Sequence, residues 1–258
     1  MILLEVTQLS KFFGGLAAID DLSFQVNKGE ILGLIGPNGA GKTTLFNVIT
    51  GVYRPSRGNI RFKEDDLVGF PPYEIAKKGI ARTFQSTILY NEMTVLENVL
   101  VGTHIHISLR LWGALLNSKG YCQMEDRSRQ KALEIIDFMG LKEVKDIKAK
   151  NLPHGHQRKL GACIALVTQP ELLLLDEPVT GMNPVESADM IEHIKRIQNL
   201  LGITIVVIEH NMKALMGLSN RIVVINYGKL IAEGLPHEIR QNEQVIEAYL
   251  GREEGGER

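Results

Sequence analysis

The segment Gly36–Thr43 constrains the fold of this chain more than any other stretch. Its residues, Gly-Pro-Asn-Gly-Ala-Gly-Lys-Thr, fit the pattern G-x-x-x-x-G-K-[ST]. An apolar run, Glu30–Ile35, precedes it, and a helix-like run, Thr44–Ile49, follows it. A glycine-rich loop between a strand and a helix is the context in which backbone N–H groups surround a polyphosphate. Because strands and helices also alternate further along the chain, the sequence predicts an α/β fold.

This loop predicts a site for a nucleoside triphosphate, here taken as ATP, together with Mg²⁺. We expect Lys42 to reach the outer phosphates and the Thr43 hydroxyl to hold the metal ion. The helix that follows adds free N–H donors and the positive end of its dipole. The residues predicted to bind the nucleotide here are Gly36, Pro37, Asn38, Gly39, Ala40, Gly41, Lys42, Thr43 and Thr44.

A second apolar run, Glu171–Asp176, ends in a carboxylate, and a second carboxylate, Glu177, follows directly. Such an unbroken run is typical of a strand buried on both faces of a parallel sheet. Asp176 therefore stands where a second oxygen ligand for Mg²⁺ is expected. Glu177, one residue further on, is the candidate general base that polarises a water molecule toward the terminal phosphate.

Length and composition narrow the class of protein. A chain of 258 residues with 44% hydrophobic and 23% charged residues can form one large domain with a subdomain. A net charge of −1 argues against a general nucleic-acid binder. Cys122 and Cys163 lack metal-ligand spacing, and no apolar run approaches the roughly 20 residues that span a bilayer. Since the N-terminus carries no signal-like segment, we expect a cytoplasmic protein whose membrane role depends on a partner.

The remaining pattern predicts short strands near the N-terminus and helices from about Met93 onward. Thr94 and Glu97 fit a capping box at the start of the first of these helices. We expect one domain over residues 1–258, with a core at about 1–90 and 168–258 and a helical subdomain at about 91–167. The expected elements are strands Ile2–Thr7, Leu22–Val26, Asn59–Phe62 and Ile203–Ile208, helices Met124–Met139, Pro184–Leu200 and His237–Leu250, a helix from about Gln157, and a hairpin of Arg221–Ile225 with Lys229–Ala232.

The order and spacing of several blocks resemble the ATP-binding subunits of ABC transporters over nearly the whole chain. The resemblance implies a P-loop NTPase (RecA-like) core, an N-terminal antiparallel β subdomain and an inserted α-helical subdomain. The blocks that carry it are Ser10–Gly15, Gly36–Thr43, Thr83–Gln85, Leu152–Arg158, Leu175–Pro178 and Ile208–His210.

This resemblance implies further roles at matching positions. Phe13 matches the aromatic residue that stacks on adenine, with Phe12 as the alternative. Gln85 matches a glutamine that contacts Mg²⁺ and the attacking water, and His210 matches a histidine that contacts the terminal phosphate. The implied catalytic set is Glu177, His210, Gln85 and Lys42, and the implied metal ligands are Thr43, Gln85 and Asp176.

The segment Leu152–His156 departs from the family pattern Leu-Ser-Gly-Gly-Gln. The resemblance implies that Gly155 contacts ATP held by an opposite subunit, so we expect a homodimer or heterodimer of ATPase subunits. Because Pro153 removes the serine hydroxyl, we predict a weaker hold on the terminal phosphate. His154 and His156 replace the first glycine and the glutamine, and Asn183 stands at the position of a family aspartate.

Within the family, the chain resembles the ATPases that energise uptake of branched-chain or other hydrophobic amino acids. The implied partners are integral membrane permease subunits and, indirectly, a solute-binding protein, with the chain peripheral on the inner face of the membrane. Leu89, Tyr90 and Met93 are candidate lining residues of the permease groove. The features of this branch are Ala81–Gln85, Asn91–Asn98, the insert around Trp112, Thr180–Pro184 and Ala248–Gly251.

Two alternatives remain open from the sequence. One is the ATPase of an ABC exporter, against which the branch features argue. The other is an ABC-type ATPase that acts on nucleic acid or the ribosome. Proteins of that second kind carry coiled coils, tandem ATPase halves or basic surfaces, none of which the sequence displays. We therefore expect no nucleic-acid partner.

Overall fold

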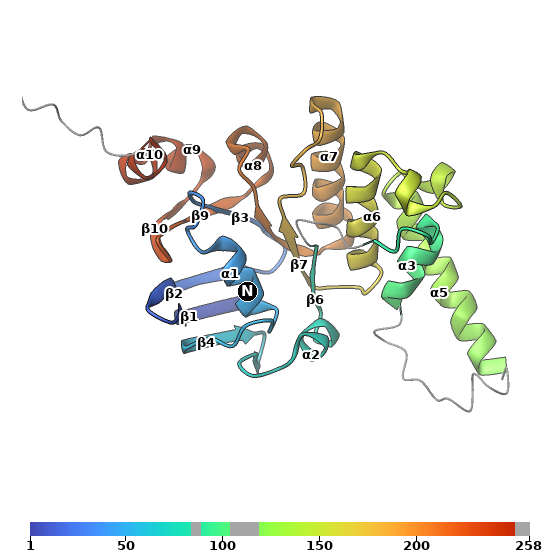
Figure 1. Cartoon of the computed structure of the whole chain (residues 1–258), viewed down its shortest axis with the longest axis horizontal. Coiled ribbons are helices and arrows are strands. Elements are labelled where there is room, and N and C mark those ends of the chain that lie inside the picture. The colour runs from blue at the N-terminus through green and yellow to red at the C-terminus, as the bar shows by residue number, and fades with distance from the viewer. Residues whose placement is uncertain (84–88, 104–118, 251–258) are drawn as a thin grey trace, which may run out of the picture.

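The computed structural model describes residues 1–83, 89–103 and 119–250 (Figure 1). The expectations for Gln85 and for the segment around Trp112 lie outside these described residues. Within them, no helix is both long enough and apolar enough to cross a membrane.

A six-stranded sheet forms the centre of the molecule, in the strand order β10-β9-β3-β8-β7-β6. Five strands are parallel, and β10 runs antiparallel to β9. Every residue of β3, β7 and β8 is buried, as their unbroken apolar runs predicted. The strands are β3 (Ile31–Ile35), β6 (Ile80–Arg82), β7 (Leu172–Asp176), β8 (Thr204–Ile208), β9 (Arg221–Asn226) and β10 (Lys229–Gly234).

A second, antiparallel sheet has the order β2-β1-β4-β5. Its strands are β1 (Ile2–Phe13), β2 (Leu16–Asn27), β4 (Arg57–Phe62) and β5 (Asp65–Asp66). The predictions Ile2–Thr7 and Leu22–Val26 were too short. The strands continue through polar residues because β1 and β2 pair with each other from Ile2–Asn27 to Phe13–Leu16. Register shifts interrupt this pairing, and Gln8 and Asp21 take positive φ values of 47° and 53° at these irregularities.

Helix α1 (Lys42–Ile49) lies between the two sheets and joins them into one core (Figure 1). Its Leu45 and Phe46 are fully buried in one hydrophobic cluster with residues of β1, β2 and β4. Alternate residues of β7 face opposite sides, since Leu172 and Leu174 belong to this cluster whereas Leu173 and Leu175 belong to the other.

Helices α3 (Val95–Thr103), α5 (Lys119–Phe138) and α6 (His154–Leu166) pack against one another beside the large sheet (Figure 1). The capping box at α3 is confirmed, because Glu97 N–H donates to Thr94 Oγ1 and Thr94 N–H donates to Glu97 Oε2. Helix α6 begins at His154 rather than at about Gln157. Its N-cap is Pro153, whose fixed φ suits the entry to a helix.

Two short helices stand at the end of the described residues, where one helix was predicted over His237–Leu250. Asn242 is extended and breaks the helix, and its side chain accepts a hydrogen bond from Val245 N–H that starts the second one. Helix α8, which the pattern did not predict, follows β8. The proposed division into core and helical subdomain stays a prediction. The remaining helices are α2 (Pro72–Lys77), α7 (Pro184–Leu201), α8 (Met212–Leu218), α9 (Pro236–Gln241) and α10 (Glu243–Leu250).

Candidate functional site

The glycine-rich loop connects β3 to α1, as predicted, and a close contact explains its last glycine. Gly41 is the N-cap of α1 with φ 102°, a conformation that side chains disfavour. A Cβ atom at this position would lie only 2.3 Å from the Ala18 carbonyl oxygen. The first turn of α1 holds no acidic residue, so its N–H groups suit an anion.

A cavity of about 480 Å³ opens directly on this loop. It brings together the end of β1, the start of β2, the loop, the end of β7 and the end of β8. The predicted residues Phe13, Glu177 and His210 line it with the loop, although they are distant in the sequence. The other lining residues are Leu16, Ala17, Ala18, Asn38, Gly39, Ala40, Gly41, Lys42, Thr43, Thr44 and Tyr227.

Lys42 lies at the inner wall of this cavity and is 6% exposed. Its ammonium donates to the carbonyl oxygens of Gly36 at 2.6 Å and Pro37 at 2.9 Å. Burial lowers the pKa of Lys42, while the nearby carboxylates of Glu177 and Asp176 oppose that effect. Lys42 therefore puts a positive charge against the loop backbone, near the two carboxylates.

Glu177 is held at both carboxylate oxygens. His210 Nε2 lies 2.8 Å from Glu177 Oε1, and the Thr180 hydroxyl donates to Glu177 Oε2 at 3.2 Å. Glu177 also adopts a positive φ of 51°, which is uncommon for a residue with a side chain. Backbone strain of this kind is concentrated at functional sites, where the surrounding structure maintains it.

Glu209 stabilises the segment that follows Glu177. It is buried, and its Oε1 accepts a hydrogen bond from Val179 N–H at 2.8 Å. Burial raises the pKa of Glu209, and backbone donors partly offset this rise. The side chain thus joins the end of β8 to the segment that follows Glu177.

Asp176 forms an ion pair that the sequence did not reveal. Arg82, at the end of β6, donates to Asp176 Oδ2 at 2.8 Å and to Asn47 Oδ1 at 2.6 Å. Its guanidinium also lies 5.4 Å from the centre of the Phe46 ring. Hard oxygen donors are what Mg²⁺ prefers, so the Asp176 carboxylate and the Thr43 hydroxyl fit this ion chemically.

Phe13 rather than Phe12 lines the cavity. The Phe13 ring makes an edge-to-face contact with Tyr53, with centroids 5.2 Å apart, and Lys11 Nζ lies 5.0 Å from its centre. This arrangement leaves the side chain 42% exposed. It favours Phe13 as the ring available to a nucleotide base.

A family model described as "ABC transporter" matches residues 19–180. The chain belongs to the ABC transporter family. A model described as "Branched-chain amino acid ATP-binding cassette transporter" matches residues 229–255 of this cassette.

Relatives and solved structures resemble the cassette over nearly its whole length. The high-affinity branched-chain amino acid transport ATP-binding protein LivG of Salmonella typhimurium is 45% identical over 249 residues, 96% of this chain and 98% of LivG. BraF of Pseudomonas aeruginosa, which has the same descriptive name, is 40% identical over the same shares. A crystal structure of a nucleotide-free ATP-binding cassette from an ABC transporter is 34% identical, with a TM-score of 0.85, and the match covers 97% of this chain and 100% of that one.

The C-terminal helix of the cassette reaches the phosphate loop. Gly36 N–H donates to the Tyr249 hydroxyl at 3.0 Å, and burial raises the pKa of Tyr249. In the sequence, the segment Ala248–Gly251 stands out only as part of the resemblance. No local pattern indicates this contact, because its two partners are 213 positions apart.

Gly155 lies in the first turn of α6, is not among the residues that line the cavity, and packs on the start of α7. A Cβ atom at Gly155 would lie 2.9 Å from Glu186 Oε1. Asn183, at the family aspartate position, caps α7 by accepting from Val185 N–H and Glu186 N–H, while Glu186 Oε2 accepts from Asn183 N–H. The departure from aspartate therefore leaves a complete capping box.

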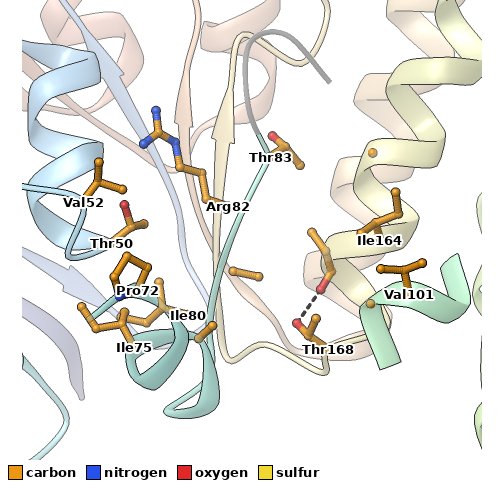
Figure 2. Close-up of a pocket in the computed structure, with 15 residues that line it drawn as sticks. Thr50, Val52, Pro72, Ile75, Ile80, Arg82, Thr83, Val101, Ile164 and Thr168 are labelled. Carbon is orange, nitrogen blue, oxygen red and sulfur yellow. Dashed lines mark hydrogen bonds between the residues drawn. The ribbon is translucent and has the colours of Figure 1, made fainter. Parts of the chain in front are cut away.

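A second cavity, of about 430 Å³, separates α1, α2 and β6 from α3 and α6 (Figure 2). Figure 2 shows side chains from α2 and β6 on one wall and from α3 and α6 on the other. The residues expected to line the permease groove, Leu89, Tyr90 and Met93, are not among those that line this cavity. The Asn98 side-chain amide donates hydrogen bonds to the carbonyl oxygens of Tyr90 and Met93. The labelled lining residues are Thr50, Val52, Pro72, Ile75, Ile80, Arg82, Thr83, Val101, Ile164 and Thr168.

Proposed function

We propose that this cassette hydrolyses ATP and energises the uptake of branched-chain or other hydrophobic amino acids through a separate membrane permease. One observation carries the proposal. Relatives that are 40–45% identical across 96% of the chain are named as ATP-binding proteins of high-affinity branched-chain amino acid transport. The C-terminal match to the branched-chain family model supports the same branch over the exporter and the soluble ATPase alternatives.

At the phosphate end of the site, the loop N–H groups and Lys42 bind the phosphate chain of ATP. Thr43 and Asp176 would hold Mg²⁺, with Gln85 as a further ligand implied by the resemblance. The ion, when bound, neutralises charge on the outer phosphates. Lys42 adds a positive charge to the cavity wall, near the carboxylates of Glu177 and Asp176.

Glu177 acts as the general base toward the attacking water. Its contacts with His210 and Thr180 fix the carboxylate at the cavity wall, so that the proton acceptor is oriented before the reaction. His210 orients the water and contacts the terminal phosphate. Because both side chains line the same cavity as the loop, a phosphate chain bound there lies within their reach.

At the base end, Phe13 stacks on adenine. Two cassettes, identical or related, enclose two nucleotides, and Gly155 of each contacts the nucleotide held by the other. Closure on ATP binding and reopening after hydrolysis then move the permease.

The groove of Figure 2 is the surface we assign to the permease. Its walls are mainly apolar and come from both the core and the helices α3 and α6. A permease segment seated there would sense a movement of one wall relative to the other. Through this attachment the cassette would lie on the inner face of the membrane.

The Glu177→Gln variant tests the chemistry. Removing the general base is expected to lower ATP turnover by about 10²- to 10⁴-fold while ATP still binds and dimers accumulate. Glu192→Gln on α7, an exposed position, is the matched control and should turn over normally. Unchanged turnover in Glu177→Gln would remove the general-base role.

Uptake of radiolabelled leucine by the complex assembled with its permease tests the transport role. Leucine entry that depends on ATP and stops in Glu177→Gln is the expected result. Copurification with an integral membrane protein is expected as well, and recovery with DNA or ribosomes instead would favour the soluble ATPase alternative. ATP-driven release of a solute from cells, without leucine entry, would favour the exporter.

A further inference from the structure

The hairpin between β9 and β10 places an aromatic residue where turns favour small ones. Asn226 pairs with Lys229, so the loop contains only Tyr227 and Gly228. Both have positive φ values, 47° and 77°. Two-residue turns of this kind favour Asn and Gly, since a bulky side chain in the left-handed region is strained.

This turn is fixed against the nucleotide site. Gly228 N–H donates to the Ala40 carbonyl of the phosphate loop at 3.0 Å, and Asp20 N–H of β2 donates to the Gly228 carbonyl at 3.0 Å. A Cβ atom at Gly228 would lie 2.9 Å from the Ala18 carbonyl oxygen. The backbone that carries Tyr227 is therefore held closely between β2 and the loop.

Tyr227 itself is 83% exposed. It nevertheless lines the cavity of about 480 Å³ together with Phe13 and the loop. The fold gains little from an aromatic ring that is both strained and solvent-exposed. A ligand that covers the ring would supply the missing stabilisation.

We propose that Tyr227 is a second aromatic contact of the bound nucleotide, packing with Phe13 against its base and ribose. This inference rests on the proposed ATP binding and adds an affinity-determining residue to it. Stacking uses the face of the ring, so the hydroxyl group is not required. The contact concerns the nucleoside part and leaves the phosphate part to the loop.

Calorimetry on the full chain, with ADP, ATP and inorganic tripolyphosphate as probes, separates these parts. Tyr227→Asn removes the ring and keeps a residue that suits a positive φ. It should weaken ADP and ATP binding about tenfold, equivalent to about 1.4 kcal/mol, and leave tripolyphosphate affinity unchanged. Tyr227→Phe is the matched control and should remain within about twofold of the wild type.

Each other outcome has a distinct meaning. Wild-type ADP affinity in Tyr227→Asn, with weakened binding in Phe13→Ala, overturns the inference and leaves the proposed function intact. An equal loss of tripolyphosphate affinity also overturns it, because Tyr227 would then act through the loop. Absence of ADP binding by the folded wild type contradicts the proposed function itself. If Tyr227→Asn unfolds at a lower temperature than the wild type, the affinities of Tyr227→Gly for ADP, ATP and tripolyphosphate are compared with those of the wild type in its place.

Discussion

Replacing Arg82 by methionine tests the buried ion pair behind the candidate metal ligand. The Arg82 and Asp176 side chains are only 5% and 2% exposed, so water cannot solvate the carboxylate that the substitution leaves behind. Arg82 also binds Asn47 of α1 and lies over Phe46. One side chain thus connects β6, β7 and the helix that follows the phosphate loop.

The expected cost follows from the burial of the pair. Breaking a buried ion pair by removing one partner typically costs about 3–5 kcal/mol. Lys42 also interacts electrostatically with Asp176 and offsets part of the loss, so we expect the lower end, about 3 kcal/mol. For a chain of this size, that loss corresponds to a fall of roughly 6–12 °C in the thermal midpoint.

Urea unfolding followed by circular dichroism measures the free energy of unfolding of each variant. Asn47→Ala, which removes a single hydrogen bond to Arg82, is the control and should cost about 1 kcal/mol. In a double-mutant cycle, Arg82→Met combined with Asp176→Asn should cost less than the sum of the two single changes, since both charges are then absent.

Two results would refute this reasoning. One is a cost of about 1 kcal/mol or less for Arg82→Met, which is what a solvent-exposed pair contributes. The other is a cycle that is additive within about 0.5 kcal/mol, which would mean that Arg82 and Asp176 do not interact in solution.

Two further predictions concern α6 and α7. Pro153→Ser supplies a capping hydroxyl, so the free energy of unfolding of the monomer should rise by about 1 kcal/mol and ATP-driven dimerisation should strengthen. Sedimentation with and without ATP measures the dimerisation. An unchanged dimer affinity contradicts the predicted contact in trans. The pKa of His193 is lowered in the folded protein, mainly by burial and secondly by the positive charge of Lys159, while the Asp189 carboxylate raises it in part. The unfolded chain therefore takes up the proton first, and stability should fall as pH drops below about 6.5, the ordinary histidine value. Thermal midpoints over this range should fall less in His193→Gln, and equal slopes for both proteins would assign the pH dependence to other groups.

The sequence alone determined the parts of the site that depend on neighbouring residues. The loop Gly36–Thr43 is a local pattern, because its glycine conformations and the following helix are set within a few positions. The carboxylates Asp176 and Glu177 were found because a buried parallel strand has a recognisable apolar run and an abrupt polar end. The capping box of Thr94 and Glu97 was readable for the same reason, since its hydrogen bonds join residues three positions apart.

Only the tertiary structure decided which distant groups meet. Arg82 and Asp176 are 94 positions apart, and Tyr249 and Gly36 are 213 apart, so no periodicity or spacing connects them. Tyr227 lies in the turn of a predicted hairpin, and only the fold brings that turn beside the phosphate loop. Strand length also depended on the fold, because pairing partners carried β1 and β2 through polar residues. Local conformational preferences act over a few residues, whereas ion pairs and cavity walls form where separate strands end at one edge of a sheet.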